Sequence, residues 1–143
     1  MTTTNTLDPK TIALQFYPPL RDGDTSGASA FLSDDWSDIP LNPGQTPGPS
    51  GYQEMVAKLR GFIPNLTWTI EDVIAGEDRV VVRSSIRGVA EGHVMGIHFS
   101  GHEVQFEAID IHQIADGKIV KTWHVEDKMS ILKQFGVPHL SFR

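Results

Sequence analysis

Hydrophobic positions in this chain change their spacing near residue 65. Before that point, apolar side chains recur three and four residues apart, as they do on one face of a helix. After it, apolar and polar side chains alternate, as they do on the two faces of a strand. The pattern therefore predicts helices in the first half of the chain and strands in the second.

The first helix is marked by the residues that flank it. Asp8 is a favoured N-cap residue, and Pro9 suits the first helical position. Pro18-Pro19 is expected to end or kink this helix, because proline supplies no backbone N–H. After a turn at residues 21–24, the spacing within residues 21–35 predicts a short second helix.

A loop and a third helix follow. Residues 37–49 contain four prolines and two glycines, which predicts a loop with a restricted backbone. Ser50 is expected to open the third helix, with Gln53 in the capping-box position. Pro64 is expected to end it.

Glycine-containing turns divide the alternating half of the chain. Strands are expected over residues 66–74, 79–87, 103–115 and 119–125. Hairpin turns are expected at residues 76–78 and 116–117, and a glycine-containing stretch, residues 88–102, separates the two middle strands. A short helix over residues 130–135 is expected to end at Gly136.

Three helices, about four antiparallel strands and a terminal helix make an α+β architecture. We expect residues 1–143 to form a single domain, in which the N-terminal helices pack in a curved antiparallel sheet. Such a sheet leaves a cone-shaped pocket, and apolar pockets of this kind commonly hold a hydrophobic small molecule.

Composition narrows the class of protein. The net charge is −6 and the 12 Lys and Arg residues are scattered, so no nucleic-acid partner is expected. The chain has no Cys, which excludes disulfides and thiolate metal sites. The N-terminus lacks the basic start and apolar core of a signal peptide, and no apolar run approaches the roughly 20 residues that span a bilayer. We therefore expect a cytoplasmic protein without a membrane partner.

Asp127 is the candidate catalytic residue. It lies between the last strand and the last helix, just after Trp123 and Val125. An apolar neighbourhood raises the pKa of a carboxyl group, which makes Asp127 a candidate proton carrier. The alternative is that Asp127 caps the helix that follows, since Asp is a favoured N-cap residue.

Removal of a proton next to a carbonyl group also requires a hydrogen-bond donor for the enolate oxygen. The candidate donors are Tyr17, Trp36, His112 and Gln113. Alternation places Ile111 and Gln113 on one face of their strand and Asp110 and His112 on the other, where the latter two could form an exposed or interface pair. His124 has the opposite parity to Asp127, but it stays a candidate because alternation can break at the end of a strand.

Three histidines, His93, His98 and His102, raise the question of a metal site. They lie along a glycine-interrupted stretch, whereas metal-binding histidines usually have tighter spacing on a rigid element together with a carboxylate. Neither a metal nor a cofactor is expected.

Seven segments of the chain resemble one known family. They are residues 62–68, 76–83, 92–97, 100–104, 109–119, 123–127 and 134–136. In this order they resemble the SnoaL-like polyketide cyclase family, which belongs to the nuclear transport factor 2-like superfamily of α+β cones. The resemblance covers residues 8–136.

The resemblance implies an acid/base role for Asp127, because in characterised cyclases of this family the aspartate after the Trp of the final strand has that role. It also implies that the face with Ile111 and Gln113 lines the cavity. The chain departs from the family at Ala90, where a histidine is usual, at Asp38-Ile39-Pro40, where a histidine often precedes the proline, and at Gln113, where an arginine is frequent.

The sequence thus predicts a small cofactor-independent enzyme that transfers protons on a hydrophobic carbonyl compound, a lyase or isomerase of the aldol-cyclisation type. The predicted catalyst is Asp127, and the predicted pocket residues are Tyr17, Trp36, Ile111, Gln113, Trp123 and His124. The alternatives are a non-catalytic ligand-binding or dimerisation domain of the same fold, and a ketone isomerase or dehydratase. A homodimer is expected through the outer face of the sheet.

Overall fold

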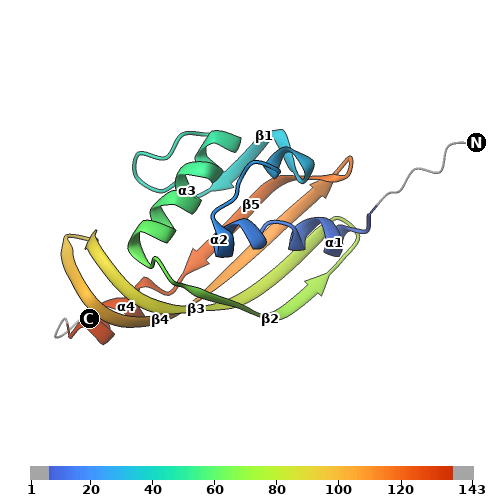
Figure 1. Ribbon diagram of the computed structural model, residues 1–143. Coiled ribbons are helices and arrows are strands. Elements are labelled where there is room, and N and C mark those ends of the chain that lie inside the picture. The colour runs from blue at the N-terminus through green and yellow to red at the C-terminus, as the bar shows by residue number, and fades with distance from the viewer. Residues whose placement is uncertain (1–6, 137–143) are drawn as a thin grey trace, which may run out of the picture.

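A computed structural model describes residues 7–136, which form a curved five-stranded sheet with helices on its concave side (Figure 1). The elements along the chain are α1 (Pro9–Leu14), α2 (Pro18–Asp22), the 3₁₀ helix η1 (Ala28–Ala30), β1 (Leu32–Ile39), α3 (Pro49–Phe62), β2 (Thr67–Ala75), β3 (Arg79–Val94), β4 (Ile97–Ala115), β5 (Lys118–Glu126) and α4 (Lys128–Phe135). The predicted α+β class is confirmed. None of the helices within these residues has the length and apolar character needed to cross a membrane.

The N-terminal helices begin and end largely where the sequence indicates. The side chain of Asp8 accepts a hydrogen bond from the N–H of Thr11 at 2.7 Å, and Pro9 occupies the first turn of α1. The Pro18-Pro19 pair interrupts the helix as expected, since α2 begins at Pro18. The predicted capping box at the start of α3 is wrong, because Gly48 takes the cap position and no side chain caps the helix.

The strand order is β1-β5-β4-β3-β2, and all neighbours are antiparallel except β1 and β5, which are parallel. On β3, Val80, Val82 and Ile86 point to the concave side and are fully buried. They pack with aromatic side chains of the helical layer, and each buried side chain of this size contributes about 1.5–3 kcal/mol relative to an exposed one. The core therefore lies between the sheet and the N-terminal helices.

Strand β1 corrects the predicted short helix and part of the predicted loop. Only Ala28–Ala30 is helical, and the chain then extends as Leu32–Ile39. Leu32 and Trp36 are buried, and β1 pairs with β5 near the other end of the chain. A local spacing pattern cannot reveal so distant a partner.

The structure also corrects the prediction that residues 88–102 separate two strands, because they form the outer half of a long β3–β4 hairpin. The turn is Met95-Gly96, with φ of 55° and 72°, as a two-residue hairpin turn requires. A bulge between Ala90 and Glu91 interrupts the register, and bulges bend a strand. Figure 1 shows the outer half of the hairpin curving up on the side of the sheet that carries α3, with α4 near its base.

Candidate functional site

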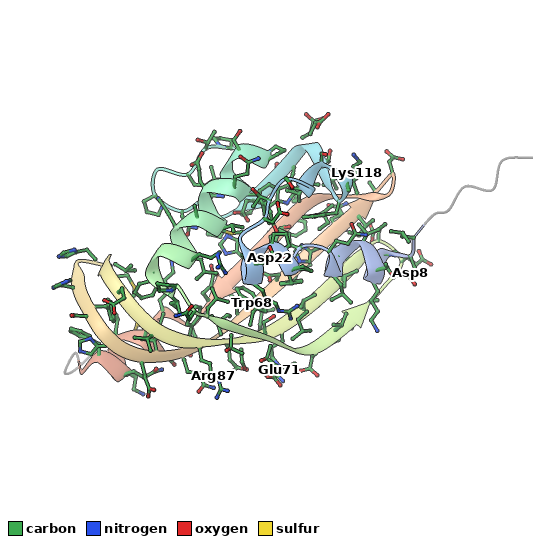
Figure 2. The ribbon with its side chains drawn as sticks, viewed as in Figure 1. Asp8, Asp22, Trp68, Glu71, Arg87 and Lys118 are labelled. Carbon is green, nitrogen blue, oxygen red and sulfur yellow. The ribbon has the colours of Figure 1, made fainter. Side chains whose placement is uncertain are left out.

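A cavity of about 690 Å³ lies on the concave side of the sheet, between α3, the tip of the β3–β4 hairpin and the inner face of β4 and β5. Its apolar wall includes Phe16, Leu59, Phe62, Trp68, Phe106 and Ile131. Figure 2 shows Trp68 on the side of the sheet that faces the helices, whereas Glu71 and Arg87 project from the other side. The cavity has the size and the mostly apolar lining of a small-molecule site.

The polar part of the cavity comes from two adjacent strands. In the β4–β5 register, His112 pairs with Thr122, Asp110 with His124, and Ala108 with Glu126. Asp110, Thr122, His124 and Glu126 line the cavity, together with Asp38 of β1. Cross-strand pairs hold their side chains close together on one face, so the sheet itself positions these groups.

The predicted cavity face of β4 and β5 is therefore wrong. Ile111 is 36% exposed on the outer face of the sheet, and Gln113 shares that face by alternation. Trp123 is opposite Ile111 on the same outer face. Cζ of Arg79 and Nζ of Lys121 lie 5.3 and 5.5 Å from the centre of the Trp123 ring. His124 does line the cavity.

Asp110 is buried, with 6% of its surface exposed, and its Oδ2 accepts a hydrogen bond from the Tyr17 hydroxyl at 2.7 Å. Burial raises the pKa of Asp110 to about 7, although the hydrogen bond from Tyr17 opposes the increase. Burial favours the neutral carboxylic acid because it removes water from around the charge. Asp110 is therefore present in both protonation states near neutral pH.

His124 lies between two carboxylates. Its Nδ1 contacts Glu126 at 2.7 Å, and its Nε2 lies 2.7 Å from the carbonyl oxygen of Pro40 and 3.3 Å from Oδ1 of Asp38. Burial alone would lower the pKa of His124, but the hydrogen bond to Glu126 and the charges of Glu126 and Asp38 outweigh burial and raise the pKa to about 9. The cavity thus holds an imidazolium next to Asp110.

Tyr17 and Trp36, both predicted pocket residues, lie buried behind the cavity lining. The Trp36 indole N–H donates to Oγ1 of Thr122 at 3.0 Å, and the Tyr17 hydroxyl also lies 2.8 Å from Nε2 of His112. They support the polar groups of the site from within the core rather than facing the cavity.

Asp127 occupies a different place from the one expected. Its side chain is exposed and accepts a hydrogen bond from the N–H of Ser130 at 3.1 Å, so it caps α4. The Ser130 hydroxyl and N–H hold the pKa of Asp127 below its ordinary value. The expected cavity position and raised pKa of Asp127 are wrong, and the capping alternative is confirmed.

Alternation along β4 could have predicted that Asp110 lies on the inner face of the sheet. Val104, Phe106 and Ala108 precede it at every second position and are buried, whereas Glu107 and its neighbours of odd number are exposed. Asp110 therefore continues the buried face of β4. Among residues 7–136, no group of three or more His, Asp or Glu side chains is arranged to hold a metal ion.

A carboxylic acid with a pKa near 7, an adjacent imidazolium and apolar walls can together accept and return a proton on a bound organic molecule. The carboxylate is the base, the carboxylic acid is the acid, and the imidazolium stabilises negative charge that develops nearby.

Comparisons with known proteins agree with this architecture. A family model described as SnoaL-like polyketide cyclase matches residues 11–135. The structure of TsrD from Streptomyces laurentii is 24% identical with a TM-score of 0.79, covering 88% of this chain and 92% of that one. A SnoaL-like polyketide cyclase from Agrobacterium tumefaciens is 24% identical with a TM-score of 0.77, covering 91% of this chain and 99% of that one. No protein of curated function matches the sequence.

Proposed function

The chain belongs to the SnoaL-like polyketide cyclase family, and on this basis we propose that it is a cofactor-independent acid/base enzyme acting on a hydrophobic carbonyl compound. The observation that carries the proposal is Asp110, a buried carboxyl group at the polar end of an otherwise apolar cavity. A general base works best when its pKa lies near the working pH, and burial raises the pKa of Asp110 to about 7.

The proposed reaction is an intramolecular aldol cyclisation. The Asp110 carboxylate removes a proton from the carbon next to a carbonyl group, and the electron pair of that C–H bond forms an enolate. The enolate carbon then bonds to a second carbonyl carbon of the same molecule, whose oxygen becomes an alkoxide. The new carboxylic acid of Asp110 returns its proton to that oxygen, so all atoms of the substrate remain in the product.

His124 has an electrostatic role in this proposal. It is the register partner of Asp110 on β5, and its two ring nitrogens are held by Glu126, Asp38 and the Pro40 carbonyl. A preorganised positive charge stabilises an enolate without having to reorient during the reaction. The apolar wall excludes water, which strengthens this interaction.

Proton exchange into a carbonyl compound tests the proposal directly. In D₂O at pH 7, we expect the protein to replace hydrogen by deuterium at the carbon next to the carbonyl in at least one member of a panel of aromatic and alicyclic diketones. Mass spectrometry of the recovered compound measures the exchange against a protein-free blank. A panel member that binds, as judged by Trp fluorescence, without any exchange across the panel would indicate a ligand-binding domain instead.

We further propose a homodimer formed through the outer face of the sheet. A row of apolar side chains crosses all five strands in register, made of Ile74, Val81, Ile111, Trp123 and Ile39. Ile74 is 66% exposed and Ile39 38%, and a continuous exposed apolar surface often marks an interface.

Ile111→Lys at the centre of this row is expected to convert the dimer into a monomer, because a charge would be buried at the interface. Sedimentation velocity of the wild type and the variant measures the change. Val89→Lys is the matched control, since Val89 is a strand residue of similar exposure outside the row. A monomeric wild type would contradict the proposed dimer.

A further inference from the structure

Five buried side chains form a continuous line of hydrogen bonds behind the cavity. The line runs from Trp36 to Thr122, His112, Tyr17 and Asp110. The successive contacts are 3.0, 2.9, 2.8 and 2.7 Å long. Because these residues come from β1, β5, β4 and the segment between α1 and α2, the line forms only when the sheet and the helical layer are assembled.

The ionised Asp110 end of the line determines its direction, and the Trp36 end is compatible with that direction. The indole N–H of Trp36 can only donate, so Oγ1 of Thr122 accepts. At the other end an ionised Asp110 can only accept, so the Tyr17 hydroxyl donates to Oδ2. Burial holds the pKa of Tyr17 well above its ordinary value, so the hydroxyl keeps its proton.

His112, in the middle of the line, carries one ring proton, which can be on Nδ1 or on Nε2. Burial lowers the pKa of His112 to about 3, so the ring is neutral and carries a single N–H. The Tyr17 proton is already directed at Asp110, so the 2.8 Å contact between Tyr17 and Nε2 requires the histidine to donate from Nε2. Nδ1 is then the acceptor, and it receives the Thr122 hydroxyl proton at 2.9 Å.

We propose that this line is a one-directional relay of positioning residues, which holds His112 as its Nε2–H tautomer and directs the Tyr17 hydroxyl onto Oδ2 of Asp110. Oδ1 is then the oxygen that exchanges a proton with the substrate. The assignment of Oδ1 as the oxygen that exchanges a proton with the substrate rests on the proposed function of Asp110. The direction of the relay rests on its hydrogen bonds alone.

Ionised Asp110 is the group that excludes the opposite direction. Trp36 does not exclude it, because a hydroxyl has two acceptor lone pairs, and Thr122 could accept from both Trp36 and Nδ1 of His112. The opposite direction would require Tyr17 to donate to Nε2 of His112, and the carboxylate of Asp110 would then lose its donor. The carboxylate therefore selects the His112 tautomer through one intervening side chain, Tyr17.

The tautomer of His112 is a direct test that does not depend on turnover. In the full chain labelled with ¹⁵N-histidine, at about pH 8.5 where Asp110 is ionised, a long-range ¹H–¹⁵N correlation spectrum is expected to show His112 with a protonated Nε2 and an unprotonated Nδ1. Tyr17→Phe is expected to convert a substantial fraction to the Nδ1–H tautomer, because Nε2–H would then be buried without an acceptor. A wild-type His112 protonated at Nδ1, or an unchanged tautomer in Tyr17→Phe, would overturn the relay.

The pKa of Asp110, followed by carboxyl ¹³C NMR, tests whether the relay reaches the carboxyl group. The charged groups around Asp110 are His124 and Glu126 of β5 and Asp38 of β1, and all three are kept in the variants. Tyr17→Phe removes the donor to Oδ2 and is expected to raise the midpoint by about one unit, a tenfold change in proton affinity.

Tyr52→Phe is the matched control. Tyr52 is as buried as Tyr17, and its hydroxyl donates to the Phe16 carbonyl at 2.6 Å, outside the relay. The control is expected to lose stability without any change in the Asp110 midpoint. Equal midpoints in Tyr17→Phe and Tyr52→Phe would contradict the relay. Absence of proton exchange with an intact relay would instead contradict only the proposed function.

Discussion

Asp110→Asn is expected to lower the proton-exchange rate by about 10²–10⁴-fold, the usual contribution of a general acid/base, while the protein remains folded and still binds the ligand. Asn has the shape of the neutral carboxylic acid, which burial already favours at Asp110. The variant can accept the Tyr17 hydrogen bond, but it cannot take up and return a proton. Deuterium incorporation gives the rate, and Trp fluorescence gives the ligand affinity.

Asp127→Asn is the matched control for that experiment. Asn is also a good N-cap residue, so α4 is expected to keep its cap and the protein its activity. The two variants test whether the catalytic residue is Asp110, as the structure indicates, or Asp127, as the sequence indicated. If Asp127→Asn lost exchange and Asp110→Asn kept it, the catalytic role would return to Asp127.

The free energy of unfolding is expected to fall as the pH rises from 6.5 to 9, chiefly because of His124. Its pKa is raised to about 9 in the folded protein, against roughly 6.5 in an unfolded chain. The stabilisation from the charged ring is therefore complete below pH 6.5 and is lost as the pH rises through 9. The loss is on the order of 2 kcal/mol.

Two other buried groups shape the acid side of this profile in opposite directions. The pKa of Asp110 is raised to about 7 in the folded protein. Its contribution to the free energy of unfolding therefore decreases as the pH rises from about 4 to 7. The pKa of His112 is lowered to about 3, so its neutral ring stabilises the fold above pH 6.5, and this stabilisation is lost as the pH falls towards 3. Between pH 4 and 6.5 the two contributions largely cancel.

Urea denaturation at pH 6.5, 7.5 and 9 measures the predicted decline. His124→Gln is expected to be less stable than the wild type at pH 6.5, because Asp38 and Glu126 lose their cationic partner. Its stability is expected to change little from pH 6.5 to 9. His98→Gln, at an exposed position on β4, should retain the full decline. A wild type whose stability rises or stays constant over this range would refute the charged state of His124.

The fold was predictable where the determinants are local. The N-cap Asp8, the proline pair at residues 18–19 and the glycine turns gave the helices and hairpins, because each acts through its immediate neighbours. Strand β1 was not predictable in this way, since it pairs in parallel with a distant strand. The polar residues between Leu32 and Trp36 also hide its alternation.

The candidate site was predictable only in part. On β4 the even-numbered side chains from Val104 to Ile114 are buried, so alternation assigns Asp110 to the cavity, whereas the family resemblance indicated the opposite face. On β5 a register shift leaves Val120 without a partner on β4, so parity counted from the buried Ile119 assigns Trp123 to the wrong face. His124 was retained as a candidate, and Glu126 shares its face two residues along β5, but Asp38 comes from β1 and could not be identified by spacing.

The parallel pairing of β1 with β5 has a consequence for how the protein is made. The β1 strand is synthesised early, but its strand partner emerges only when residues 118–126 leave the ribosome, several seconds later at about 5–20 residues per second. During that interval Trp36 and Asp38 lack the β5 partners that hold them in the native fold. Contacts of such long sequence separation form slowly. The polar end of the cavity is therefore completed among the last events of folding, and a nascent chain that stops before β5 contains most of the sheet but no assembled site.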